Sequence, residues 1–157
     1  MVSSTSSCAP VHPLTETAAV EQALIVVAER SFFAFAEPAD PSLPMTLASA
    51  EVPALTAAVR FSGPSTGEMR VTTPVALTRE LAQAFSGDPS LEFGDADLAD
   101  MAGEFANMIT GAWLTAVDTR VVFDLGAPVV TRIDTAPETS LLMQINCQPV
   151  GLAWHVD

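Results

Sequence analysis

Basic residues are scarce in this chain of 157 residues. Six lysines and arginines face nineteen aspartates and glutamates, which gives a net charge of −13 at pH 7. Phosphate backbones and anionic lipid headgroups are themselves negative, so an acidic surface repels both. The charge balance therefore argues against nucleic acid and against a membrane as partners. It is compatible with a partner that presents a lysine or a metal ion.

Long apolar runs are also missing, since none approaches the roughly 18 residues that cross a bilayer. Residues 1–14 contain neither a basic region nor an apolar stretch, so they do not resemble a secretory signal. We expect this segment to be a flexible N-terminal arm. The whole chain is 49% hydrophobic and only 16% charged. Residues 15–157 are therefore expected to fold as one domain with a substantial core.

Cysteine and histidine are each present only twice. Cys8 and Cys147 lie far apart, which favours reduced thiols and a cytoplasmic location over a disulfide. Cys147 falls in a predicted strand and is expected to be a small buried residue. His12 and His155 lie near opposite ends of the chain without the spacing of a metal site, so the sequence predicts no metal bound by the protein itself.

The pattern of apolar and turn-forming residues predicts helices and strands in separate groups. There is no alternation of strand and helix, and no glycine-rich phosphate loop. This order predicts an α+β fold: a largely antiparallel sheet of about six strands with two long helices packed on one face. The predicted helices are 15–36, ended by Pro38, then 75–86 and 95–116; the predicted strands are 45–51, 54–62, 67–73, 121–124, 129–132, 140–147 and 150–156.

A polar stripe runs along the predicted helix over 95–116. It consists of Asp97, Asp100, Glu104, Asn107 and Gly111, at spacings of 3, 4, 3 and 4. In a helix these positions share one face, within about 80° of arc. No basic residue interrupts them, whereas an ordinary solvated face mixes charges of both signs. The stripe is therefore a candidate contact surface.

Not every member of the stripe needs a functional explanation. Asp97 and Asp100 lie near the start of the helix, where acids stabilise the helix dipole. Glu104 and Asn107 could equally belong to a solvated face. Gly103 and Gly111 are less easily explained, because a glycine costs about 1 kcal/mol in a helix interior. Two of them in one helix indicate a packing or docking requirement.

The run Asp100-x-x-x-Glu104-x-x-Asn107 resembles the D/S-x-x-x-E-x-x-N signature of the CheC/CheX/FliY family of chemotaxis phosphatases. The later segment 125–130, LGAPVV, resembles the LGLP-type strand of the same family, and the likeness covers about residues 15–156. Some members carry a second copy of the signature in the first helix. Here Ile25 and Phe32 stand where that copy needs its leading polar residue and its asparagine. The chain thus resembles the single-site CheX type, and its first helix is expected to be structural.

The resemblance implies an activity: removal of the phosphoryl group from the aspartyl phosphate of a CheY-like response regulator. It implies that Glu104 pairs with the regulator's lysine and that Asn107 orients the attacking water. Beside them, the small residues Gly103 and Gly111 would let a partner approach the helix closely, and the charge of Asp100 could steer a cationic group of the partner. It implies no cofactor of the protein's own, with Mg²⁺ supplied by the regulator, and a homodimer. This division of labour suits phosphoryl transfer, which depends on positioning and charge neutralisation.

Two other classes of function compete with this interpretation. The first is a non-catalytic binding module for a response regulator or another signalling protein. Such a module would need no amide aimed at a water, so the presence of both Glu104 and Asn107 favours catalysis. The second is an unrelated α+β domain such as a hot-dog fold. It would need an acid or histidine in a cleft, and the sequence offers no suitable histidine.

Overall fold

The computed structural model describes residues 15–157, and in this range three α-helices accompany seven strands of one sheet. The strand order is β1-β6-β7-β3-β2-β4, with β5 also beside β2, and every pairing is antiparallel. The α+β class is confirmed, while the arm expected over 1–14 lies outside the described residues. The elements are α1 (Thr17–Phe32), β1 (Ala36–Pro38), β2 (Ala54–Ser62), β3 (Gly67–Pro74), α2 (Val75–Ser86), α3 (Asp95–Val117), β4 (Asp124–Leu125), β5 (Val129–Ile133), β6 (Leu141–Ile145) and β7 (Gln148–Val156).

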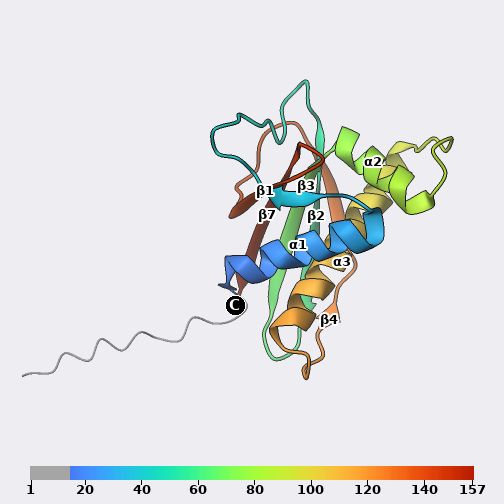
Figure 1. The fold of residues 1–157 in the computed structure, drawn as a ribbon. Helices are drawn as coiled ribbons and strands as arrows, with labels where there is room; N and C mark the ends of the chain where they lie inside the picture. The colour runs from blue at the N-terminus through green and yellow to red at the C-terminus, as the bar shows by residue number, and fades with distance from the viewer. Residues whose placement is uncertain (1–14) are drawn as a thin grey trace, which may run out of the picture.

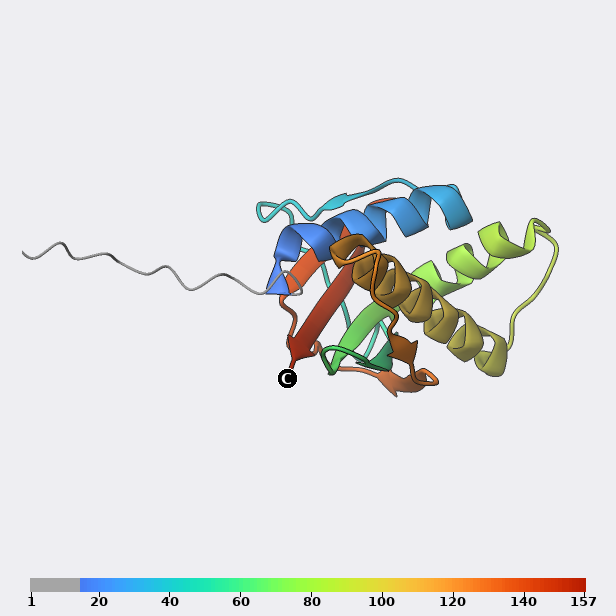
Figure 2. The ribbon, with the colours of Figure 1, turned by 90° about the horizontal axis from the view of Figure 1, so that it is seen from below.

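The helices lie together on one face of the sheet, as Figures 1 and 2 show from two directions. The two longest, α1 and α3, cross the sheet next to each other, and α2 lies beside the N-terminal half of α3. Alternation along the strands explains why only one face is covered. In β2, for example, Leu55, Ala57 and Val59 are buried, whereas Arg60 on the other face is exposed.

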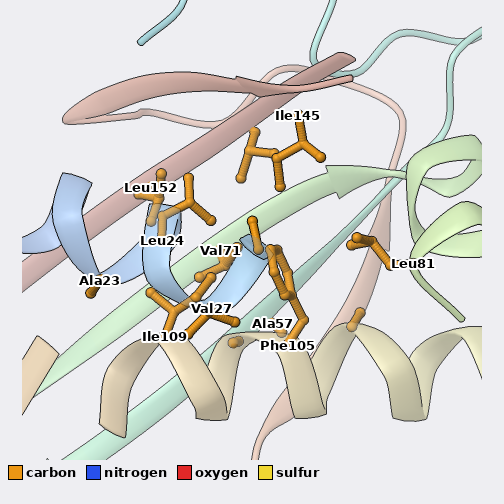
Figure 3. Packing of buried hydrophobic residues seen from close by; sticks show 14 of the residues in the cluster. Ala23, Leu24, Val27, Ala57, Val71, Leu81, Phe105, Ile109, Ile145 and Leu152 are labelled. Carbon is orange, nitrogen blue, oxygen red and sulfur yellow. The ribbon is translucent and has the colours of Figure 1, made fainter. Parts of the chain in front are cut away.

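The core lies between these helices and the sheet (Figure 3). Phe105 and Ile109 of α3 join Leu24 and Val27 of α1 in this core, between the helices and the strands. All four side chains are less than 10% exposed. Because a helix can bury only one side against a sheet, this packing sets the rotation of α3 about its axis. The polar stripe is thereby directed away from the core.

The first helix is shorter than expected. It was predicted to run to residue 36, but it ends at Phe32 because Phe33 adopts the left-handed conformation, with φ 52° and ψ 35°. The N–H groups of Phe33 and Ala34 both bond to the carbonyl of Ala28, which closes the last turn. Residues 36–38 then pair with β6 as a short edge strand. The helix has therefore already ended before the chain reaches Pro38, and this proline is not what ends it.

The strand predicted over 45–51 is wrong. These residues form bends, and Ser49 and Val52 bond to each other's backbone in a tight turn. The burial expected for Cys147 is also wrong, because this residue lies exposed in the turn between β6 and β7. Asn146 and Cys147 both have positive φ, as a two-residue hairpin turn requires.

Within residues 15–157, the helices are too short or too polar to cross a lipid bilayer.

Candidate functional site

The start of α3 is organised by Asp97. Its carboxylate accepts a hydrogen bond from the N–H of Gly94, with an N···O distance of 3.0 Å. Gly94 is the residue that precedes the helix, so this bond satisfies a backbone group at the helix end. The interpretation of Asp97 as a helix-start acid is therefore confirmed.

The remaining stripe residues differ in exposure. Asp100 and Glu104 are exposed, whereas Asn107 and Gly111 are half-buried. Neighbouring side chains on the inner face, such as Phe105, are fully buried. The helix thus presents a polar face to solvent along about four turns, with Glu104 near its centre.

Glu104 and Asn107 have no polar partner in the part of the chain that the structure describes. Neither side chain takes part in a hydrogen bond or an ion pair there. For a half-buried amide such as Asn107 this is unusual, because side-chain amides at protein surfaces commonly bond to nearby backbone. Both groups are therefore available to an incoming molecule, and they lie one helical turn apart on the same face.

The electrostatic character of this face is uniformly negative. Its ionisable residues are Asp97, Asp100 and Glu104, and α3 carries no basic residue. The face therefore favours a cationic partner group, such as the ammonium of a lysine.

The two glycines of α3 occupy different surroundings. Gly103 is buried, and a Cβ built on it would lie 3.1 Å from Cβ of Pro128 and 3.5 Å from Cγ2 of Val130. A side chain at Gly103 would thus crowd the chain's own packing. Gly111 is half-buried, and a Cβ there would meet only Cδ1 of Leu125, at 3.9 Å. The fold itself leaves room for a side chain at Gly111.

A shallow groove lies between α2 and the N-terminal half of α3, with a volume of about 290 Å³. Its α3 side includes Asp100 and Glu104, so it adjoins the polar stripe. Its lining residues are Ala82, Phe85, Ser86, Phe93, Asp97, Asp100, Met101 and Glu104. The other concavities of the described chain include larger ones on the opposite face of the sheet, around Arg70 and His155, away from the stripe.

No group of three histidine, cysteine, aspartate or glutamate side chains among residues 15–157 is placed to hold a metal ion.

Comparison with known proteins identifies the family. The family model described as "Chemotaxis phosphatase CheX" matches residues 55–142, which is more than half of the chain and contains all of α3. The chain belongs to the CheX family. No curated protein sequence matches it.

Solved CheX structures share the fold. A chemotaxis protein CheX from Desulfovibrio desulfuricans is 17% identical, with a TM-score of 0.66 over 89% of this chain and 97% of that chain. A CheX from Vibrio vulnificus is 18% identical, with a TM-score of 0.66 over 90% and 95% of the two chains. A CheX–CheY–BeF3–Mg²⁺ complex from Borrelia burgdorferi gives 13% identity and a TM-score of 0.59 over 88% and 96%. At these identities the likeness shows a common fold.

The first helix of this CheX-family chain is buried where a second copy of the signature would end. Phe32, which stands at the position of the second asparagine, is 2% exposed. Its ring packs edge-on against Phe105 of α3, with the ring centroids 5.3 Å apart. Phe32 therefore joins two helices in the core, as a structural residue would.

Sequence reasoning missed the aromatic side of the site. Phe85 and Phe93 line the groove, although neither was singled out from the sequence. Their positions in the sequence could have indicated this role. Phe85 lies near the end of α2, and Phe93 directly precedes the residue that caps α3. Large apolar residues that flank a connection between two helices are natural candidates for a surface beside it.

Proposed function

We propose that this protein is a phosphatase that hydrolyses the aspartyl phosphate of a CheY-like response regulator. One observation carries the proposal: Glu104 and Asn107 lie one turn apart on the same outward face of α3, and neither has a polar partner in the described chain. Membership of a family described as a chemotaxis phosphatase supports it. So does the fold that this chain shares with a CheX found in complex with CheY.

In the proposed reaction the two side chains have separate roles. The Glu104 carboxylate pairs with the regulator's active-site lysine and so places α3 over the phosphorylation site. The Asn107 amide enters that site and holds a water in line with the phosphorus. The water oxygen forms a bond to phosphorus while the bond to the aspartyl oxygen breaks, which releases inorganic phosphate and a free carboxylate. Mg²⁺, held by the regulator, neutralises the developing charge.

An amide suits the role of Asn107 for a physical reason. It can donate to one oxygen and accept from another, so it fixes the orientation of a water without adding charge. A carboxylate at the same position would repel the phosphoryl oxygens. In GTP hydrolysis a glutamine amide orients the attacking water in the same manner.

Other parts of the surface fit a docked partner. Asp100 is exposed beside Glu104, and Gly111 offers clearance that the fold does not itself need. Gly103 is buried against Pro128, so its part in docking would be to keep α3 in place. Cys147 is a free, exposed cysteine, and a reducing environment such as the cytoplasm keeps such a thiol reduced. We therefore propose a cytoplasmic location.

We also propose a homodimer. β5 lies at the margin of the sheet, where it pairs with β2 and with no other strand of the described chain. Its Val129 is 66% exposed, and an open edge of this kind can pair with another strand. Light scattering after gel filtration tests this, since a dimer has twice the 16.4 kDa of one chain.

The experiment that tests the proposed activity is phosphoryl decay of a purified CheY-type regulator from the same organism, with Mg²⁺ present. Asn107→Ala should slow the catalysed decay by about 10²-fold, the scale for loss of one positioned polar group. Gln22→Ala, which removes an exposed amide from α1, is the matched control and should leave the rate unchanged. If Asn107→Ala leaves the catalysed decay unchanged, Asn107 does not orient the water. If the unmodified protein binds the phosphorylated regulator but does not speed its decay, the protein is a binding module instead.

A further inference from the structure

The groove between α2 and α3 is apolar on one side and acidic on the other. Phe85, Phe93 and Met101 supply its apolar lining, and Asp97, Asp100 and Glu104 form its α3 rim. None of its lining residues is basic. Asp97 and Glu104 lie seven residues apart, so the rim extends about 10 Å along the helix from the proposed lysine contact.

Phe85 is exposed and also in contact with the core. Its side chain is 54% exposed, which leaves a large aromatic surface in water. The inner part of the ring packs on Phe32, with ring centroids 5.7 Å apart, and Phe32 in turn packs on Phe105. Packing against another ring restricts the rotamers of Phe85, and a restricted side chain loses less conformational entropy on binding. Such residues are the typical anchors of protein interfaces.

The charge of the rim selects the kind of occupant. A second copy of this chain would bring a net charge of −13 against an acidic rim, and the chain contains six arginines and no lysine. Association through this groove between two copies is therefore opposed by electrostatic repulsion. A segment that combines a large apolar side chain with a neighbouring basic residue satisfies both sides of the groove.

We propose that the groove receives a large apolar side chain of the response regulator, located beside the lysine that pairs with Glu104. This inference rests on the proposed phosphatase function and adds a second contact to it. Glu104 and Asn107 act on the phosphorylation site, whereas Phe85, Phe93 and Met101 recognise the surface next to it. The groove then determines affinity for the regulator and has no part in positioning the water.

The aromatic chain Phe85–Phe32–Phe105 also gives Phe32 a part in the groove. The phenylalanine at position 32 cannot orient a water, but it supports the exposed ring that lines the groove of the remaining site. A single site with an added apolar contact would hold one regulator more tightly than the polar stripe alone could.

The test compares Phe85→Ser with Phe35→Ser. Phe35 is 63% exposed and does not line the groove, so the same substitution there is the matched control. Steady-state dephosphorylation of the CheY-type regulator, phosphorylated with acetyl phosphate, is measured with the full chain. Phe85→Ser should raise KM at least about 10-fold and leave kcat within about 2-fold, whereas Phe35→Ser should change neither. Phe85→Leu should restore KM to within about 3-fold of the original.

Further measurements separate an apolar contact from other causes. Thermal melts verify that each variant folds, and Phe93→Ser provides a second variant if Phe85→Ser does not. The effect on KM should persist at about 0.5 M salt, because apolar contacts are not screened. Unchanged KM in a folded Phe85→Ser or Phe93→Ser protein, or an equal rise in Phe35→Ser, would overturn the proposal.

The experiments can contradict the groove proposal and the proposed phosphatase function separately. If Asn107→Ala loses activity while Phe85→Ser keeps its KM, the groove is excluded and the function stands. If Asn107→Ala keeps full activity, the role of Asn107 fails, and if the unmodified protein does not speed the decay, the proposed function fails. Calorimetric titration with the regulator loaded with BeF3⁻ and Mg²⁺ then tests whether the groove contributes to binding of the regulator. Binding at least about 10-fold weaker for Phe85→Ser supports it, and equal binding overturns it.

Discussion

Gly103 of α3 and Pro128, just before β5, are in close contact: a Cβ on Gly103 would lie 3.1 Å from Cβ of Pro128. Each residue belongs to one of the two sequence segments that resemble the phosphatase family. The proline ring is rigid and cannot move aside cheaply, so the glycine allows α3 to approach the sheet beside β5. Since Glu104 is the next residue, this contact also sets how far the polar stripe stands out from the sheet.

The two glycines of α3 should therefore respond differently to alanine. Gly111→Ala should stabilise the protein by up to about 1 kcal/mol, because helix propensity improves and the nearest atom is 3.9 Å away. Gly103→Ala gains the same propensity but crowds Pro128, so it should be about 1 to 2 kcal/mol less stable than Gly111→Ala. Urea unfolding measures both values. In the phosphatase assay Gly111→Ala should raise KM, since its clearance would serve the partner; an unchanged KM removes Gly111 from the docking surface.

Glu104 should affect binding more than chemistry. Glu104→Ala removes the partner of the regulator's lysine and should raise KM, and Glu104→Lys should raise it further by charge repulsion. Because Glu104 is exposed and without a described polar partner, stability should change by no more than about 0.5 kcal/mol in either variant. Steady-state kinetics together with thermal melts provide the measurement. A KM that stays the same in Glu104→Lys would contradict the lysine pairing.

Asp97 should matter for stability. Its carboxylate bonds to the N–H of Gly94, so Asp97→Ala should destabilise the protein by about 0.5 to 1 kcal/mol. Asp97→Asn keeps an oxygen acceptor and should recover most of that loss. Chemical denaturation of the three proteins at neutral pH tests this, and equal stability of all three would mean that the bond contributes nothing.

Glu68 should give the protein part of its sensitivity to acid. This carboxylate is 7% exposed and lies between Arg60 and Arg70, at N···O distances of 3.2 and 2.6 Å. Burial alone would raise the pKa of Glu68, but the hydrogen bonds and charges of Arg70 and Arg60 outweigh it and lower the pKa. The resulting stability is present above the unfolded pKa of about 4.3 and is lost as pH falls through the lower folded pKa.

Removal of the Glu68 charge tests this link between pH and stability. Between about pH 5 and pH 3, wild type should lose up to about 1 kcal/mol more stability than Glu68→Gln, a limit set by the solvent screening of the two arginines. Asp40, Asp88 and Asp118 also have lowered pKa values, each through hydrogen bonds to a neighbour two residues on. These three carboxylates are present in both proteins, so their contributions to the pH dependence of stability cancel in the comparison. Parallel loss of stability in the two proteins would contradict the role of Glu68.

Local sequence signals were sufficient to predict the bounds of several helices and strands. The predicted bounds of β2 and α2 agree with the structure, and α3 differs by one residue at its end. For α2 the reason is visible: Pro74 precedes its first turn and Gly87 follows in the left-handed conformation. Both residues act through their own backbone, so neighbours distant in the chain do not change their effect.

Other features depended on contacts between distant segments. The end of α1 at Phe32 reflects a bent chain that places residues 36–38 against β6, more than 100 residues later. No pattern within the segment predicts that pairing. The stretch 45–51 has the composition of a strand, yet Leu47 and Ala48 are buried in a turn region. Burial by tertiary packing overrode the local preference.

For the site, spacing along the chain was enough to place Glu104 and Asn107 on one face of a helix, because helical periodicity is a property of the backbone alone. Spacing could not show that Gly103 turns inward, that Gly111 is left with room, or that Phe85 lies beside Glu104. Those outcomes depend on where Pro128 and α2 come to rest against α3. The position of a side chain on its helix is local, but its surroundings are set by the packing of segments that only the folded chain brings together.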